Sequence, residues 1–241
     1  MKKINVKFPD FRRIPVYQTL VLFFLVMITI LLVVIMFWIK DQKGGTINNP
    51  FQVQVSDTDN FVFLGDSLTD FYPLEEFYDE LPVVNSGVSG YQTTDILSRI
   101  DSMVTIYNPT KVFLLIGTND IEAERSEDEI VENIAEIIDR IHEKRPKAKI
   151  YLESLLPVNR SEDEKINHDT VARRTNETIQ SINEKLESYA EENDIEFINL
   201  YDEFTDENGE LALKYTEEGL HLSNLGYLRL TNILLPYFQD E

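Results

Sequence analysis

The stretch FVFLGDSLT, residues 61–69, decides the fold and much of the chemistry of this chain. Its first four residues, Phe61–Leu64, form a short apolar run, which predicts a buried strand. Gly65 permits a sharp turn after that strand, so Ser67 can expose its hydroxyl at the top of a sheet. A serine in that place is a candidate nucleophile when a base and donors for an oxyanion lie close by.

Three later segments offer those missing groups. They supply, in chain order, a glycine backbone donor, a side-chain amide donor and an acid–base pair, which together with a serine are the parts that acyl transfer requires. The segments are Gly87-Val88-Ser89-Gly90, Gly117-Thr118-Asn119-Asp120 and Glu218-Gly219-Leu220-His221.

Strand-like and helix-like patterns alternate after residue 60, which predicts an α/β domain with a parallel sheet covered on both faces. In such a sheet the functional site lies at the carboxyl ends of the strands. Ser67, Gly90 and Asn119 each follow a predicted strand. The predicted strands are Asn60–Leu64, Leu81–Val84, Lys111–Ile116, Lys149–Leu155 and Ile195–Asn199, and the predicted helices lie near Thr93–Ile106, Glu127–Arg145, Thr170–Glu192 and Asn224–Phe238.

The helix predicted over Glu127–Arg145 carries the clearest local signals. Ser126 followed by Glu129 matches a capping box, and Pro146 stops the helix. Between them, isoleucines at helical spacing form one apolar stripe that should face the sheet. These residues are Ile130, Ile134, Ile137, Ile138 and Ile141.

The four segments together resemble the blocks of the SGNH/GDSL hydrolase family, named for Ser, Gly, Asn and His. Four blocks in order are far more specific than a lone Gly-Asp-Ser-Leu, and the resemblance runs from Asn60 to the C-terminus. It implies a three-layer α/β/α, flavodoxin-like fold with a mainly parallel five-stranded sheet, and ester hydrolysis. The matching blocks are Gly65–Leu68, Asn85–Gly90, Gly117–Asp120 and Glu218–His221.

The resemblance and the chemistry together assign roles. Ser67 is the predicted nucleophile, His221 its base and Glu218 the acid that orients the imidazole. Gly90 matches the oxyanion glycine of the family, and Asn119 can aim its amide N–H at the same point. With the backbone N–H of Ser67 they would form a three-donor oxyanion hole.

The chain departs from the family pattern at two positions. Glu218 stands where the family usually has Asp, so its longer side chain leaves open a serine–histidine dyad with Glu218 at the periphery. Tyr91 follows the oxyanion glycine where the family often has Asp. Asp66 and Asp120 are interpreted as structural residues that bond nearby backbone groups.

The other two histidines are weaker candidates. His142 lies beside the apolar stripe of a helix and is interpreted as a surface residue, and His168 lies in the polar stretch Ser161–Asp169, interpreted as a mobile loop. The pair His168-Asp169 is far short of a metal site. The chain has no cysteine, which excludes disulfides and thiolate chemistry, and we expect neither a metal nor a cofactor.

Residues 19–39, TLVLFFLVMITILLVVIMFWI, form an unbroken run without a charge. At about 1.5 Å per residue this run covers about 30 Å, the thickness of a hydrocarbon core. A buried core helix and a cleaved signal peptide are the alternatives. A helix this long without a polar face does not suit a core, and the run ends without a cleavage site. We therefore expect an uncleaved transmembrane signal anchor.

More basic residues precede the span than follow it closely, which places the N-terminus in the cytoplasm and the rest outside the cell membrane. They are Lys2, Lys3, Lys7, Arg12 and Arg13 before it, and Lys40 and Lys43 after it. The predicted parts are a cytoplasmic tail (1–18), the single-pass anchor (19–39), a linker (40–59) and the hydrolase domain (60–241). The first 43 residues hold seven basic and two acidic residues, so the remainder holds 15 and 41, a net charge of −26. This charge should repel nucleic acid and anionic headgroups.

The leading functional hypothesis is a membrane-anchored, extracytoplasmic bacterial esterase that removes small acyl groups, above all O-acetyl, from carbohydrate. A second hypothesis is an O-acyltransferase acting on cell-surface glycan, in which a sugar hydroxyl replaces water. A third is a non-catalytic binding module, against which the complete Ser, Gly, Asn and His set argues. The expected partners are a small-molecule or glycan ester and, through residues 19–39, the membrane; the sequence leaves the oligomeric state open.

Overall fold

The computed structural model describes Met27, residues 59–79 and residues 81–239. The predicted cytoplasmic tail, transmembrane anchor and linker therefore lie outside the described residues, apart from Met27 and Asp59. Among the residues that are described, no helix is both long enough and apolar enough to cross a membrane.

In the described residues the core of the domain is a five-stranded sheet with the strand order β2-β1-β3-β4-β5, and every neighbouring pair runs parallel. The predicted parallel sheet is thus confirmed, with strand ends displaced by at most three residues. The strands are β1 (Phe61–Gly65), β2 (Val83–Gly87), β3 (Lys111–Leu115), β4 (Lys149–Glu153) and β5 (Glu196–Ile198).

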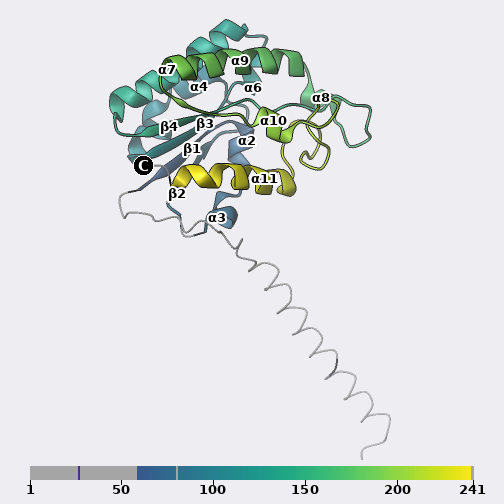
Figure 1. Cartoon of the computed structure of the whole chain (residues 1–241), viewed down its shortest axis with the longest axis horizontal. Coiled ribbons are helices and arrows are strands. Elements are labelled where there is room, and N and C mark those ends of the chain that lie inside the picture. Colours follow the sequence, from purple (N-terminus) through teal and green to yellow (C-terminus); the bar gives the residue numbers. More distant parts are fainter. Residues whose placement is uncertain (1–26, 28–58, 80, 240–241) are drawn as a thin grey trace, which may run out of the picture. The chain divides into compact units, whose positions relative to one another are not determined.

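Helices cover both faces of this sheet, which gives the expected three layers (Figure 1). The longest helices of the described residues, α7 and α9, pack against each other on one face, where α4 also contacts α7. The other face is covered by α11 and the 3₁₀ helix η3. The elements are α2 (Ser67–Asp70), α3 (Leu74–Phe77), α4 (Thr93–Leu97), α5 (Ile100–Met103), η2 (Thr105–Tyr107), α6 (Thr118–Glu122), α7 (Glu127–Lys144), α8 (His168–Val171), α9 (Asn176–Glu192), α10 (Tyr201–Phe204), α11 (Asn224–Leu234) and η3 (Leu235–Phe238).

The isoleucine stripe of α7 is buried as predicted, with Ile130, Ile134, Ile137 and Ile141 at 0% exposure. The opposite face of the sheet is aromatic. Phe238 of η3 packs on it, with ring centroids 5.1 Å from Phe61, 6.2 Å from Phe63 and 5.2 Å from Phe113. Burial of these rings and aliphatic side chains is the main favourable term in folding the domain.

Two predicted helices are wrong as continuous elements. The segment predicted over Thr93–Ile106 is split into α4, α5 and η2, because Arg99 leaves the helical conformation (φ −132°, ψ 14°). The segment predicted over Thr170–Glu192 is split at Ala172, whose φ of 53° and ψ of −123° no α-helix contains. Helix α9 then begins after Thr175, whose hydroxyl accepts a hydrogen bond from the backbone of Thr178.

The predicted capping box of α7 is confirmed at its N-cap, where Ser126 Oγ accepts from the backbone N–H of Glu129 at 3.3 Å. The Glu129 carboxylate contacts Arg125 rather than returning to the helix start. At the C-terminus, the segment predicted as one helix over Asn224–Phe238 ends as α11 at Leu234 and continues from Leu235 as η3, whose first turn contains Pro236.

The turn into α2 depends on close packing at two glycines. A Cβ on Gly65 would lie 2.3 Å from the carbonyl oxygen of Leu115, and one on Gly87 would lie 2.2 Å from the backbone nitrogen of Asp70. Any larger residue would therefore push β1 away from β3, or β2 away from α2. The absence of side chains at these two positions lets α2 lie directly on the ends of the strands.

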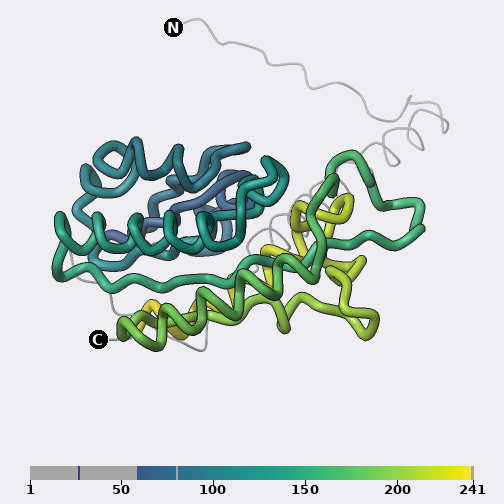
Figure 2. The backbone as a smooth tube through the Cα atoms, turned by 90° about the horizontal axis from the view of Figure 1, so that it is seen from above, coloured from purple at the N-terminus to yellow at the C-terminus, as the bar shows by residue number. Residues whose placement is uncertain are grey.

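Two irregular segments far apart in the sequence lie side by side at one end of the sheet (Figure 2). The backbone N–H of Asn159 donates to Gly219 O at 2.8 Å, and that of Asn167 donates to Glu218 O at 2.8 Å. Leu211 donates in the same way to Val158 O at 3.1 Å. These bonds tie the predicted acid–base segment to the chain that follows β4.

A buried carboxyl lies at the end of β4, on the same side of the strand as the aromatic residue Tyr151. Glu153 is 3% exposed, and burial raises its pKa to about 8. Its charge also helps to raise the pKa of Tyr72 and Tyr78, for which burial is the larger cause. The hydroxyls of Tyr72 and Tyr78 lie 2.8 Å apart.

This carboxyl predicts a specific dependence of stability on pH. Between pH 4.5 and about 8 the folded protein keeps a proton on Glu153 that the unfolded chain has released. The free energy of unfolding should therefore fall as pH rises through this range, by up to about 1.4 kcal/mol per pH unit. Chemical denaturation between pH 5 and 8 should show that Glu153→Gln removes this contribution. Glu196→Gln, at an exposed position of β5, is the control; equal slopes for Glu153→Gln and the unsubstituted protein would contradict the prediction.

Candidate active site

Ser67 is the first residue of α2 and is separated from the end of β1 only by Asp66. Asp66 caps this helix, because its Oδ1 accepts a hydrogen bond from the backbone N–H of Leu68 at 3.0 Å. The N–H groups of a first helical turn have no acceptor within the helix, so the Ser67 N–H remains for an external oxygen. Ser67 itself is 7% exposed.

The structure brings the three predicted catalytic residues into one chain of hydrogen bonds. Ser67 Oγ lies 2.9 Å from His221 Nε2, and His221 Nδ1 lies 2.6 Å from Glu218 Oε1. With a proton on Nδ1 directed at the carboxylate, Nε2 is left as the acceptor for the serine proton. The side chains of His221 and Glu218 are 24% and 22% exposed, so the imidazole is reachable from solvent.

The longer side chain of Glu218 is accommodated because the chain turns tightly here, so that its carboxylate contacts a residue of the same turn. Its Oε1 accepts from the backbone N–H of His221 at 3.0 Å, as well as from the ring. Thr216 closes the turn: its Oγ1 donates to His221 O at 2.9 Å and accepts from Gly219 N at 2.7 Å. Gly219 has a φ of +108°, which disfavours any other residue there. The carboxylate is therefore fixed by two donors of one residue.

The other two predicted oxyanion donors follow β2 and β3: Gly90 lies in the loop after β2, and Asn119 is the second residue of α6. Gly90 is exposed, with a φ of +82° and open space where a Cβ would stand. Asn119 Nδ2 donates to the backbone oxygen of Tyr91 at 2.9 Å, which ties the amide to the residue after Gly90. An amide nitrogen carries two hydrogens, so the second remains for a substrate oxygen. Tyr91, which stands where the family often has Asp, takes part in this contact through its backbone carbonyl oxygen.

Asp66 and Asp120 have the structural contacts that the sequence predicted. Asp120 is 0% exposed and holds Thr93 through the backbone N–H at 2.9 Å and through Oγ1 at 2.6 Å. It also pairs with Arg125 Nε at 3.0 Å. Burial raises the pKa of Asp120, and it raises that of Asp66 to about 7, although the Leu68 N–H and the Arg174 charge pull the Asp66 value down.

Two residues near the site were not singled out from the sequence. Phe71 follows α2, is 53% exposed, and its ring centroid lies 5.2 Å from that of His221. Arg174 is 4% exposed and donates from Nη2 to Asn119 Oδ1 at 2.9 Å. Arg174 was not singled out because it falls inside the one helix predicted over Thr170–Glu192. The N-cap residue Thr175 was a usable signal that a helix begins after it.

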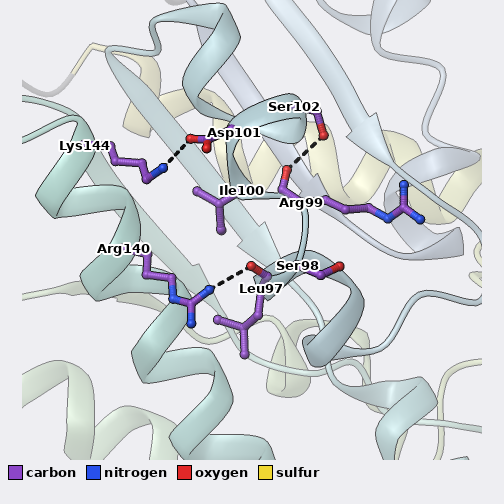
Figure 3. A pocket seen from close by; sticks show the side chains of 8 residues that line it. All are labelled: Leu97, Ser98, Arg99, Ile100, Asp101, Ser102, Arg140 and Lys144. Atoms are coloured by element: carbon purple, nitrogen blue, oxygen red, sulfur yellow. Dashed lines mark hydrogen bonds and ion pairs between the residues drawn. The ribbon is translucent and has the colours of Figure 1, made fainter.

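The other two histidines lie apart from this hydrogen-bonded set. His142 is half-buried on α7, and His168 is exposed at the start of α8. A hollow of about 610 Å³ between α4, α5 and α7 contains none of the predicted site residues (Figure 3). Two of its basic groups are engaged within the protein: Lys144 contacts Asp101, and Arg140 donates to Leu97 O at 2.9 Å.

A parallel α/β sheet with a Ser–His–Glu chain at the carboxyl ends of its strands defines a serine hydrolase of the α/β class. Residues 63–229 match the GDSL-like Lipase/Acylhydrolase family, and the chain belongs to this family. The SGNH/GDSL resemblance is thereby confirmed, and the chain is an ester hydrolase of this type.

Three proteins illustrate the similarity. A Streptococcus pneumonia protein, described as a candidate platelet activating factor, is 37% identical with a TM-score of 0.68, covering 79% of this chain and 87% of that one. A GDSL-like lipase from Bacteroides thetaiotaomicron is 26% identical with a TM-score of 0.66, covering 82% and 96%. The N-acylneuraminate cytidylyltransferase of Escherichia coli O18:K1:H7 (strain RS218 / NMEC) is 29% identical over 177 residues, which is 72% of this chain but 39% of that relative.

The contacts of Glu218 generate a prediction about the acid. His221→Ala should remove nearly all activity, because Ser67 then lacks its base. Glu218→Gln keeps the shape but loses the charge that stabilises the imidazolium, so it should cost clearly less than His221→Ala. Glu218→Asp should stay within about tenfold of the unsubstituted protein, under ~1.4 kcal/mol in barrier. Steady-state kinetics on p-nitrophenyl acetate measure all three.

An unchanged kcat in Glu218→Gln would contradict the role of Glu218. The enzyme would then work as a serine–histidine dyad, or it would take its acid from another residue. Glu217→Gln, one residue earlier on the same exposed turn, is the matched control for the loss of one negative charge.

Proposed function

We propose that this protein is a serine esterase that hydrolyses small acyl esters of carbohydrate through an acyl-enzyme on Ser67. The observation that carries the proposal is the 2.9 Å contact of Ser67 Oγ with His221 Nε2, backed by the 2.6 Å contact of His221 Nδ1 with Glu218. A nucleophile, a base and an orienting acid in hydrogen-bond contact form the geometric signature of nucleophilic acyl transfer.

In the proposed reaction, Ser67 Oγ attacks the ester carbonyl carbon while its proton passes to His221 Nε2. The carbonyl electron pair moves to oxygen, and the N–H groups of Ser67, Gly90 and Asn119 bind the resulting oxyanion. The bond to the alcohol then breaks, and the alcohol leaves with the proton from His221. Water attacks the acyl-enzyme by the same route, and the free acid and Ser67 are released.

Three observations support an uncharged sugar as the alcohol component of the ester. Asp70 and Ser89 bond each other beside the serine loop, with 2.5 Å between Ser89 Oγ and Asp70 Oδ2, so this edge of the site is polar. The exposed ring of Phe71 next to His221 offers an apolar face on which a sugar ring can lie. The net charge of −26 after residue 43 disfavours anionic surfaces.

The proposal is tested with the full-length protein in detergent. Acetate release is followed from p-nitrophenyl acetate, from neutral acetylated oligosaccharides and from a long-chain acyl ester. We expect release from the first two and much slower cleavage of the third. A fluorophosphonate probe should label the protein, and Ser67→Ala should abolish both labelling and release, with Ser188→Ala, at an exposed position of α9, as the control serine.

Each other outcome identifies a different function. Labelling of a serine other than Ser67 would show that the nucleophile is wrongly assigned. Faster transfer of acetyl to an added sugar acceptor than to water would indicate an O-acyltransferase. Neither labelling nor release on any ester would indicate a binding module.

We further propose that residues 19–39 anchor the protein in the membrane with the hydrolase domain outside. The support is the 21-residue run without a charge and the basic residues that precede it. Intact mass of the membrane-extracted protein should show that residues 1–39 are retained. A mature N-terminus between about residues 40 and 45 would instead identify a cleaved signal peptide.

A further inference from the structure

An asparagine in an oxyanion hole has a problem of orientation. Its amide group has an oxygen acceptor on one side and a nitrogen donor on the other, so a rotation of about 180° would present the wrong group to the substrate. Only the orientation with Nδ2 toward the oxyanion helps catalysis. Asn119 therefore needs partners that distinguish its two ends.

The structure supplies one partner for each end of the Asn119 amide. Nδ2 donates to the backbone oxygen of Tyr91 at 2.9 Å, and Oδ1 accepts from Arg174 Nη2 at 2.9 Å. In the rotated orientation, Asn119 would point its NH₂ group at the guanidinium and its oxygen at a carbonyl oxygen. Both contacts would then be repulsive, because arginine has no acceptor and a carbonyl has no donor.

We propose that Arg174 is a positioning residue of the oxyanion hole, which fixes and polarises the amide of Asn119. This inference rests on the proposed esterase function and goes beyond it by naming a residue that acts through Asn119. A positive charge on the oxygen side of the amide draws electron density from Nδ2 and strengthens the remaining N–H as a donor. That donor is the one predicted to face the developing oxyanion.

Arg174 is held too completely to be a substrate-binding residue. It is 4% exposed, and every nitrogen of its guanidinium has a protein partner. Nε donates to both Thr118 O and Thr118 Oγ1 at 3.0 Å, and Nη1 donates to Thr170 O at 3.2 Å and to Val171 O at 3.3 Å. Arg174 thus hydrogen-bonds to both Thr118 and Asn119, the first two residues of α6.

The flat guanidinium suits this task better than an ammonium group. Its fork of donors reaches Thr118 through Nε and Asn119 through Nη2 in a fixed geometry, which a lysine on a flexible stem does not reproduce. Burial lowers the pKa of Arg174, but the negative charges of Glu122 and Asp66 counteract this, and arginine stays protonated in proteins. The charge behind Asn119 is therefore permanent.

The turn that immediately precedes Arg174 has a strained backbone. Ala172 has a φ of 53° and a ψ of −123°, a conformation that residues with a Cβ rarely adopt. Arg160 holds the turn from outside, since its Nη1 donates to Ala172 O at 2.7 Å and to Arg174 O at 2.9 Å. Backbone strain of this kind persists where the surroundings fix it, often at functional sites.

A double-mutant cycle between Arg174 and Asn119 tests the proposal in the full-length protein. Asn119→Ala should lower kcat by about 100-fold with KM little changed. Arg174→Met, which keeps an unbranched apolar stem, should lower kcat by about tenfold or more with KM again little changed. In the Asn119→Ala background, Arg174→Met should have less than about a threefold further effect, because the group it positions is gone.

Two further variants control for charge and folding. Arg173→Met removes the same charge from the neighbouring residue, which is exposed and pairs with Glu122 and Glu124, and should leave kcat within about twofold of the unsubstituted protein. Arg174→Lys keeps the charge and a long stem. It should still lower kcat in the native background and not in Asn119→Ala, and it replaces Arg174→Met in the cycle if the methionine variant fails to fold.

A readout independent of activity separates this inference from the proposed function. In ¹⁵N NMR spectra, the side-chain amide of Asn119 is identified by its loss in Asn119→Ala. Arg174→Lys should shift or broaden that signal, and Arg173→Met should not. An undisturbed Asn119 amide, or a kcat loss from Arg174 substitution that is equally large without Asn119, would overturn the inference. An inactive unsubstituted protein with a disturbed amide would instead overturn the proposed function alone.

Discussion

The active site depends on the register of three parallel strands. Gly65 at the end of β1 pairs with Gly87 at the end of β2 and with Leu115 at the end of β3, so the three strands stop at one level. The next residues of each strand then rise from the same edge of the sheet. Ser67, Gly90 and Asn119 thus follow the same edge of the sheet, and hydrogen bonds such as those from Ser89 to Asp70 and from Asn119 to Tyr91 then link the three segments. The small size of Gly65 and Gly87 keeps this edge tight.

The acid–base pair reaches the same edge by different means. Glu218 and His221 lie on no strand or helix, and backbone and hydroxyl hydrogen bonds hold their turn in place of a ladder. The segment after β4 supplies the external bonds, through Asn159 and Asn167. The site therefore has two parts. The residues at the strand ends are positioned by the sheet, whereas the turn that carries Glu218 and His221 is positioned by hydrogen bonds between loops. Only the first part follows from the geometry of the sheet.

This division explains what the sequence could predict. The five strands, the apolar stripe of α7 and the identities of Ser67, Asn119 and His221 follow from periodicity and motifs, because each signal lies within a short window. The break at Ala172 could not be predicted in this way, because its cause is a tertiary contact. Arg160, twelve residues earlier, hydrogen-bonds to this turn. Arg174 was missed for the same reason, because its partner Asn119 lies 55 residues earlier.

The polar groups beneath the site favour a fixed geometry over maximal stability. Asp66, Asp120 and Arg174 are all nearly buried, and burial raises the pKa of both carboxyls while it lowers that of the guanidinium. Burying charges costs several kcal/mol per ion even when they are paired, and apolar replacements are often no less stable. An apolar cluster, however, could not distinguish the two ends of the Asn119 amide or cap α2 beneath Ser67. The aromatic and isoleucine-rich layers on the two faces of the sheet supply the stability that offsets this cost.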